Sequence, residues 1–279
     1  MAQPQVDDFQ YGDHRLVYET HGEGNRVVVL LHGLLLDAGL NRALAQSLAA
    51  RGNRVVLLDL LGHGRSDRPP RATAHRMDRY ADQCIALLDH LGVEQAVLGG
   101  PSLGANVSLF AAVRAPQRVR GMIIEMPVLE WAAPAAGAIF IPMLMAVHYM
   151  RRIALVITRA MGRVPRTGFG PLDSALNTAS MHPDEMAAVL HGMLVGPTAP
   201  AVEERSELLQ PTLIIGHGRD VLHPFSDATN LHAQLRNSRI IQAKNVMELR
   251  VRPTRLTGEI VAFLDEVWQP HAVASDTGS

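Results

Sequence analysis

The chain has 279 residues, 47% of them hydrophobic, so it can bury a sizeable core as one large α/β domain or a domain with an insertion. Its 26 basic and 27 acidic residues give a formal net charge of −1. This balance gives no reason to expect nucleic acid or an anionic membrane surface as a partner.

Three features bear on where the protein works. The single cysteine, Cys84, excludes an intramolecular disulfide and favours a reducing, cytoplasmic location. Cys84 also falls in a helical apolar stripe, so we expect it in the core. The first residues lack the basic and apolar regions of a signal peptide. The uncharged run from Trp131 to Met150 contains Pro134 and Pro142, which favour a buried or pocket-lining helical region over a membrane span.

Short, continuously apolar runs alternate with helical patterns along most of the chain. Helical stripes or turns follow the runs at Leu40–Leu48, 80–91, 103–115 and 256–267. The six runs are Val27–Leu31, Val55–Leu58, Ala96–Leu98, Gly121–Ile124, Thr212–Ile215 and Arg239–Ile241. Such an alternation predicts an α/β fold with a mostly parallel sheet and helices on both faces.

The alternation stops between residues 128 and 209. This stretch is rich in methionine and alanine, contains several prolines, and is too long for a structureless loop. We predict a helical cap at 128–209, inserted between two parts of the core at 1–127 and 210–268. The polar residues 269–279 are predicted to form a flexible tail.

The strongest chemical signal is Gly100-Pro101-Ser102-Leu103-Gly104, a G-x-S-x-G pattern between a predicted strand and a predicted helix. In that setting the serine lies on a tight strand-to-helix turn, and its hydroxyl is exposed at the carboxyl edge of the sheet. The helix N-terminus supplies N–H groups for a developing oxyanion. The alternative is a turn in which Ser102 only caps the helix.

Together with two further motifs, this pattern resembles the α/β-hydrolase superfamily over roughly residues 14–268. "LLHGLLLD" (30–37) is similar to the His-Gly loop of that family, and "DLLGHGRSDRP" (59–69) to the loop after its next strand. The resemblance implies the α/β-hydrolase fold, with Ser102 as nucleophile and the N–H groups of Leu34 and Leu103 as oxyanion donors. It assigns no catalytic role to His63 or Asp59.

The acid of the expected triad has two candidates. "PTLIIGHGRDVLHPF" (211–225) resembles the strand and loop that carry the acid in the family, which places it at Asp220. The acid would hold an imidazole in one tautomer and stabilise the imidazolium. Alternatively, Asp220 caps a following helix, and Glu125, directly after the fourth run, is the acid.

The family histidine is absent from its usual place. The matching window reads Ala243-Lys244-Asn245-Val246-Met247-Glu248, and neither Asn245 nor Val246 can take a proton from Ser102. Lys244 would need a strongly depressed pKa, which a polar loop does not favour. We take His223 as the replacement base, three residues after Asp220. The other candidates are His217, at the sheet edge, with His148 and His191 in the cap.

These residues predict a cofactor-independent serine hydrolase that acts on a small apolar ester or related acyl compound. No Cys/His cluster suggests a metal. Serine at the strand-to-helix turn of the G-x-S-x-G pattern, called the nucleophile elbow, argues against branches of the superfamily that use aspartate there. The apolar residues of the cap either suit a lipophilic ligand or form the cap's own core. Those residues are Trp131, Ile139, Phe140, Ile141, Met143, Met145, Met150 and Met161. The alternative is a catalytically weak or inactive protein of this fold that binds a hydrophobic ligand. No oligomeric state follows from the sequence.

Overall fold

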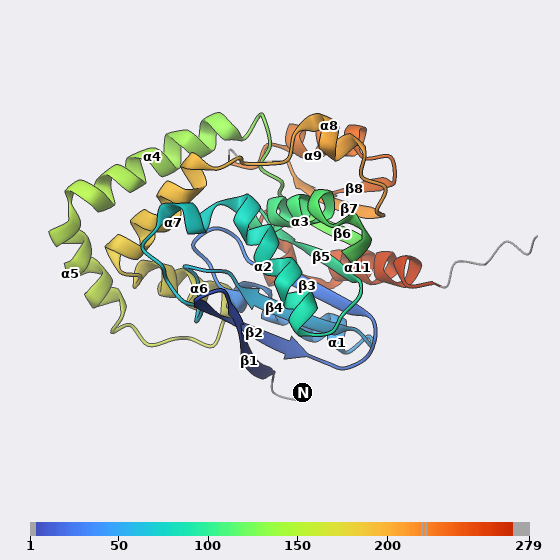
Figure 1. Cartoon of the computed structure of the whole chain (residues 1–279), viewed down its shortest axis with the longest axis horizontal. Helices are drawn as coiled ribbons and strands as arrows, with labels where there is room; N and C mark the ends of the chain where they lie inside the picture. Colours follow the sequence, from blue (N-terminus) through green and yellow to red (C-terminus); the bar gives the residue numbers. More distant parts are fainter. Residues whose placement is uncertain (1–3, 219, 221, 270–279) are drawn as a thin grey trace, which may run out of the picture.

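A single eight-stranded sheet forms the centre of the molecule (Figure 1). The computed structural model describes residues 4–218, 220 and 222–269. The strand order is β1-β2-β4-β3-β5-β6-β7-β8. The strands are β1 (Gln5–Tyr11), β2 (His14–His21), β3 (Val27–Leu31), β4 (Arg54–Asp59), β5 (Ala96–Pro101), β6 (Val119–Glu125), β7 (Thr212–His217) and β8 (Ser238–Ala243).

Strands β3 to β8 are parallel, while β1 pairs antiparallel with β2 and β2 antiparallel with β4. The prediction of a mostly parallel sheet is therefore confirmed, and the six apolar runs are the strands β3 to β8. The hairpin β1–β2 was not predicted. Strand β1 lies at the sheet edge with only Phe9 buried, so its sequence is too polar to read as an apolar run.

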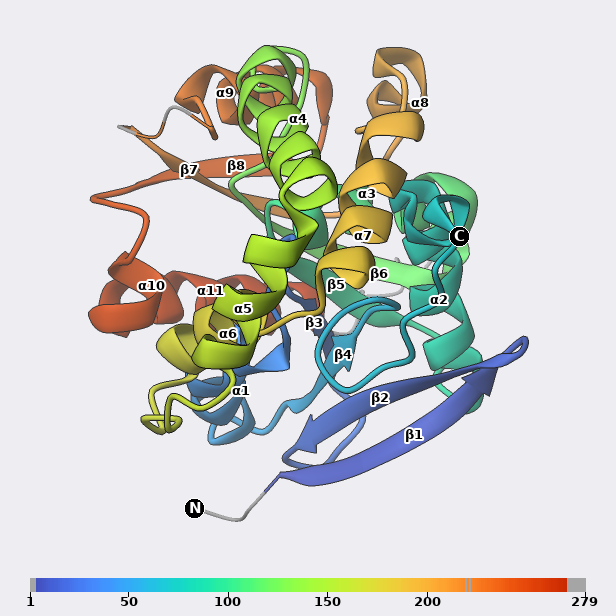
Figure 2. The same cartoon turned by 90° about the vertical axis from the view of Figure 1, so that its left-hand side faces the viewer.

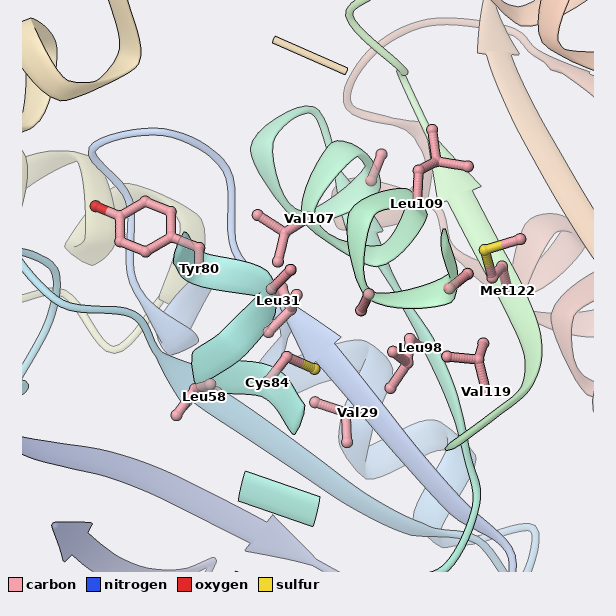
Figure 3. Close-up of a cluster of buried hydrophobic side chains, with 14 of the residues drawn as sticks. Val29, Leu31, Leu58, Tyr80, Cys84, Leu98, Val107, Leu109, Val119 and Met122 are labelled. Atoms are coloured by element: carbon pink, nitrogen blue, oxygen red, sulfur yellow. The ribbon is translucent and has the colours of Figure 1, made fainter. Parts of the chain in front are cut away.

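Helices cover both faces of the sheet, as predicted. Along β3, Val29 and Leu31 point to one face, whereas Val28 and Leu30 point to the other. The first face is covered by α2 (Met77–His90), α3 (Leu103–Arg114) and α9 (Phe225–Gln234); the second is covered by α1 (Arg42–Ala49) and α11 (Thr254–Val267). Figure 3 shows the first core, where Cys84 is buried as expected.

Between β6 and β7 the chain forms a helical insertion (residues 126–211). It contains α4 (Ala133–Tyr149), α5 (Arg151–Met161), α6 (Gly170–Ala179), α7 (Pro183–Val195) and α8 (Val202–Ser206). Helix α6 contacts the short 3₁₀ helix η1 (Ala38–Asn41), and α7 contacts η2 (Ala72–His75). Because η1 and η2 follow β3 and β4, the insertion lies over loops at the carboxyl ends of parallel strands. Figure 2 shows α4 to α7 gathered on this side.

Two buried polar residues fix the ends of the insertion. The Asn106 amide on α3 donates to the carbonyls of Val128 and Thr198, at 2.6 and 2.7 Å, and accepts the Val128 N–H at 3.1 Å. The carboxylate of Asp227 on α9 accepts three backbone N–H groups, those of Leu129, Trp131 and Ala132. Both side chains are fully buried, so the start of α4 is held rigidly against the core.

The apolar side chains of this region were predicted to line a ligand pocket or to form the core of the cap, and for five of them this prediction was wrong. Trp131, Ile139, Ile141, Met145 and Met150 are 46 to 67% exposed and belong neither to a pocket nor to a core. The reason is geometric: α4 packs on α7 along one side, and no described element covers the other. Of the predicted tail 269–279, all but Gln269 lies outside the described residues.

Candidate active site

Ser102 lies between β5 and α3 in a sharp backbone turn. Its φ of 53° is in the left-handed region, which is rare for a residue other than glycine. The flanking glycines are required by contacts with β3: a Cβ on Gly100 would lie 2.1 Å from the Leu31 carbonyl oxygen, and one on Gly104 2.7 Å from the same atom. The G-x-S-x-G spacing therefore lets α3 and β5 pack closely on β3 while Ser102 faces a cavity.

Two residues whose backbone N–H groups no described residue engages, Leu34 and Leu103, line the same cavity as this serine. Leu103 is the first residue of α3, where a helix leaves its N–H groups without intrahelical partners. Leu34 belongs to the loop after β3 and lines the cavity together with Ser102 and Leu103. Among the described residues, neither N–H donates to a protein acceptor. An oxyanion hole requires N–H groups that the protein does not already engage, and both of these N–H groups meet that requirement.

His32 shapes the loop that carries Leu34. Its Nδ1 donates to the Gly33 carbonyl at 2.9 Å, and its Nε2 accepts the Leu60 N–H at 3.1 Å. Burial lowers the pKa of His32, so the ring is neutral and has one defined tautomer. His63 is also buried and donates to the Leu61 carbonyl, and burial lowers its pKa further. These contacts fix loops around the site.

Asp220, His223 and Ser102 form a continuous hydrogen-bonded chain. The loop between β7 and α9 brings His223 Nε2 to 3.0 Å from Ser102 Oγ, and His223 Nδ1 to 2.7 Å from an Asp220 carboxylate oxygen. Nδ1 donates to the carboxylate, so Nε2 is free to accept the hydroxyl proton of Ser102. The three residues have the geometry of a nucleophile, a base and an acid that orients the base.

The loop also holds the Asp220 carboxylate ionised. Its other oxygen accepts the backbone N–H groups of Leu222, at 2.9 Å, and His223, at 3.2 Å. Partial burial alone would raise the pKa of Asp220, but the hydrogen bond and charge of His223 and the two backbone N–H groups lower it overall. The ionised form is therefore the one that faces the imidazole.

Glu125, the other candidate acid, is paired elsewhere. Its carboxylate accepts from Arg250 Nη1 at 2.5 and 2.7 Å, and both side chains are almost fully buried. Burial alone would raise the pKa of Glu125, but the charge of Arg250 and a contact with His217 lower it. The structure brings His223 to Asp220 and not to Glu125. Arg250 was not singled out from the sequence, although a glutamate that ends a buried strand signals a need for a nearby cation.

The window that lacks the family histidine forms a wall of the site. Val246 and Met247 line a cavity of about 530 Å³ together with Ser102, Asp220 and His223. The short helix α10 (Glu248–Val251) follows and carries Arg250 to Glu125. The loop is closed by Glu248, which accepts the Lys244 backbone N–H and pairs with Arg255.

The other histidines considered as bases do not meet Ser102. His217 is fully buried with Nε2 3.7 Å from Glu125. His148 on α4 and His191 on α7 are exposed. Among the described residues, His223 is therefore the imidazole that the structure pairs with the elbow serine.

An apolar cavity opens from Ser102 under the insertion. Its volume is about 130 Å³, and it adjoins the larger cavity at Leu34, Ser102, Phe140 and Leu222. Most of its lining is apolar: Leu34, Met77, Leu103, Val128, Ala133, Ala136, Phe140, Met193, Leu194 and Leu222. Within residues 4–218, 220 and 222–269, no group of three or more histidine, cysteine, aspartate or glutamate side chains could hold a metal ion.

Comparison with known proteins identifies the class. Residues 26–158 match the family model described as alpha/beta hydrolase fold. A 2-hydroxymuconate semialdehyde hydrolase of Pseudomonas sp. (strain CF600) is 36% identical over 99 residues, which are 35% of this chain and 35% of that protein. A haloalkane dehalogenase of Mycolicibacterium paratuberculosis is 31% identical over 112 residues, which are 39% and 37% of the two chains. The matches thus span about a third of the length of these curated relatives.

Solved structures resemble the whole chain more fully. A thermophilic esterase from Thermogutta terrifontis has a TM-score of 0.76 at 23% identity and covers 96% of this chain and 100% of its own. The enol-lactonase of Burkholderia xenovorans LB400 has a TM-score of 0.74 at 17% identity, covering 93% and 100%. The chain has the α/β-hydrolase fold, as its motifs predicted, and residues 26–158 match the model of that family.

Proposed function

We propose that the protein is a serine hydrolase that cleaves an ester or a related acyl compound with a small apolar acyl group. The carrying observation is the hydrogen-bonded chain from Ser102 Oγ through His223 to Asp220, at 3.0 and 2.7 Å, at the mouth of an apolar cavity. The hydrolases and the haloalkane dehalogenase among its relatives support a hydrolytic reaction. A serine at the elbow supports an acyl-enzyme route.

In the proposed mechanism, His223 Nε2 takes the Ser102 hydroxyl proton while Oγ attacks the substrate carbonyl carbon. The carbonyl oxygen becomes an oxyanion and accepts the N–H groups of Leu34 and Leu103. The imidazolium, stabilised by Asp220, then donates its proton to the leaving alcohol, and an acyl-serine remains. A water molecule repeats the sequence with His223 as base, which releases the acid and restores Ser102.

The cavity supports a preference for apolar acyl groups. Val128, Phe140, Met193 and Leu194 from the insertion and Leu103 from the core line a space of about 130 Å³ beside Ser102. Methionine and aliphatic side chains gain from contact with CH₂ groups, each worth about 0.8 kcal/mol when buried. A charged acyl group would lose hydration there without a partner. Four-carbon acyl esters are therefore expected to be better substrates than acetates.

The test combines turnover with active-site labelling. Hydrolysis of 4-nitrophenyl butyrate and reaction with a fluorophosphonate probe are measured for wild type, Ser102→Ala, His223→Asn and His191→Asn. Ser102→Ala and His223→Asn are each expected to lower kcat by about 10³-fold or more, because triad members act as a unit. His191→Asn, an exposed histidine of the insertion, is the matched control and is expected to behave as wild type.

Two results would contradict the proposal. If the wild type neither reacts with the probe nor exceeds Ser102→Ala in turnover, the protein is not a serine hydrolase. If Ser102→Ala is inactive but His223→Asn retains wild-type kcat, the base is another group. Among the described residues, no contact specifically favours the alternative of an inactive binding protein.

A further inference from the structure

Helices α4 and α5 lie on the side of the molecule opposite α11 (Figure 1), and their exposed side chains are largely apolar. Large hydrophobic side chains that are at least one-third exposed concentrate between residues 131 and 172, which contain twelve of the twenty found among the described residues. They are Trp131, Ile139, Ile141, Met145, Tyr149, Met150, Ile153, Val156, Ile157, Val164, Phe169 and Leu172. An exposed apolar surface of this kind marks an interaction site in a folded protein.

The exposed residues follow helical periodicity, so they form faces. On α4, Ile141, Met145 and Tyr149 lie on one outer side. On α5, Ile153, Val156 and Ile157 form an outward stripe at i, i+3 and i+4, 53 to 67% exposed. The residues between them on α5 are less exposed and face the rest of the insertion. Figure 2 shows α4 passing into α5, with α7 beside α4 and α6 next to α5.

The same surface is strongly basic. Residues 131–172 contain five arginines, at 151, 152, 159, 163 and 166, and no aspartate or glutamate. On α5, Arg152 and Arg159 are seven residues apart and lie beside the apolar stripe. Arg151 pairs with Asp184 at 2.6 Å, whereas Arg152, Arg159 and Arg163 make no ion pair with any described residue. Glu130 and Asp173 flank this range, and Asp173 interacts with Arg166, so the local positive excess is carried by Arg152, Arg159 and Arg163.

We propose that the α4–α5 surface docks on an anionic lipid bilayer, with its apolar side chains at the headgroup–acyl boundary and its arginines among the lipid phosphates. An apolar stripe flanked by arginines is the arrangement of interfacial helices. Trp131 and Tyr149, 67 and 74% exposed near the ends of α4, are the aromatic types that prefer this boundary. The proposal does not depend on the hydrolase activity.

Docking on the surface fits the geometry better than spanning. No single described helix is long and apolar enough to cross a membrane. Helices α4 and α5 reach the required length and hydropathy only as a pair, and they are bent by 99° at their junction. A second copy of the chain is a poorer occupant, since a two-fold interface through this surface would bring its arginines together without acidic partners.

The docked surface adjoins the apolar cavity. The less exposed side of α4 contributes Ala136, Gly137 and Phe140 to the cavity that contains Ser102, while its outer side carries Ile141 and Met145. One helix thus separates the proposed lipid phase from the candidate active site. A substrate dissolved in the bilayer could reach Ser102 around α4 without crossing bulk water.

The test is co-sedimentation of the whole protein with vesicles of phosphatidylcholine, alone or with 30% phosphatidylglycerol, at two salt concentrations. The variant Val156→Ser/Ile157→Ser removes two exposed apolar side chains, and Val6→Ser/Leu209→Ser is its control at exposed apolar positions elsewhere. The variant Arg152→Gln/Arg159→Gln removes two charges, and Arg51→Gln/Arg236→Gln, also exposed, is its control. Thermal unfolding checks that each variant is folded.

We expect the wild type to bind the anionic vesicles, and more weakly at high salt. Loss of the two arginines should lower the partition coefficient by roughly 30-fold, and loss of the two apolar side chains by at least about tenfold. Both controls should bind like wild type. Absence of binding, equal binding to neutral vesicles, or variants that bind like wild type would overturn the proposal. So would a wild-type dimer in light scattering that Val156→Ser/Ile157→Ser converts to a monomer, because a second copy would then occupy the surface.

Discussion

Asp220→Asn and Glu125→Gln are predicted to damage the protein in opposite ways. Asp220 accepts the Nδ1 proton of His223 at 2.7 Å, and their side chains are 15 and 12% exposed. At an effective dielectric constant of about 20, unit charges 2.7 Å apart attract by about 6 kcal/mol, and partial exposure reduces this to about 4 kcal/mol. An asparagine loses this stabilisation of the imidazolium, so kcat should fall by about 10³-fold. Stability should change by less than about 1 kcal/mol, because the amide oxygen can still accept backbone N–H groups.

Glu125→Gln leaves the Arg250 guanidinium buried without its counter-ion. The two side chains are only 3 and 5% exposed, and the removal of one partner from such a buried pair costs about 3–5 kcal/mol of stability. For a chain of this size the melting temperature should fall by about 10 °C. Catalysis per folded molecule should stay within about threefold of wild type. The Ser102 N–H donates to the Glu125 backbone carbonyl at 2.8 Å, and that bond is unchanged by the substitution.

The assay separates these effects by measuring kcat on 4-nitrophenyl butyrate, normalised by fluorophosphonate titration, and unfolding by calorimetry. The double variant Glu125→Gln/Arg250→Met should recover part of the lost stability, since it removes the orphaned charge. The reasoning is refuted if folded, probe-reactive Glu125→Gln loses its turnover while Asp220→Asn retains wild-type kcat. Glu125 would then be the acid, and the hydrogen bond between Asp220 and His223 would be dispensable.

Three further predictions concern the frame around the site. Gly100→Ala should prevent correct folding, seen as loss of the near-ultraviolet dichroism signal, because its Cβ would lie 2.1 Å from the Leu31 carbonyl oxygen. Asn106→Ala should lower the free energy of unfolding in urea by about 3 kcal/mol, because the amide's buried partners at both ends of the insertion lose their hydrogen bonds. Burial alone would raise the pKa of Glu19, but a histidine and two arginines lower it to about 2. The ionised carboxylate therefore contributes about 3 kcal/mol to the free energy of unfolding above pH 4.5, and this contribution is lost as pH falls toward 2. Glu19→Gln should flatten that part of the profile of unfolding free energy against pH.

The core of the fold was predictable because parallel strands buried on both faces read as continuous apolar runs. Val27–Leu31 is an example, with all five residues buried. The hairpin β1–β2 was not predictable in this way because its edge strand β1 is mostly polar and has only Phe9 buried. The outward direction of Ile141 and Met145 was also not predictable. A hydrophobic side chain favours burial, but whether another helix or strand covers it depends on tertiary packing.

At the site, the local pattern carried most of the information. The G-x-S-x-G spacing located Ser102 because only glycines tolerate the close approach of β3. The pairing of His223 with Asp220 could be suggested from their separation of three residues, but its geometry depends on a loop whose path the sequence does not determine. Arg250 was missed because it reaches Glu125 from a helix 125 residues away.

The two halves of the site explain one another. In a family member with the usual histidine, the loop after β8 would supply the base. Here the loop after β8 has structural roles instead. It leads into α10, which places Arg250 against Glu125, and its residues Val246 and Met247 line the cavity. The proposed acid and base instead lie three residues apart on the loop after β7, where Asp220 binds both the ring and the backbone N–H of His223. This short loop orders the imidazole without any contribution from β8. The proposed relay therefore needs only Ser102 and one other loop, and the region around Asn245 could change without loss of the proton-transfer geometry.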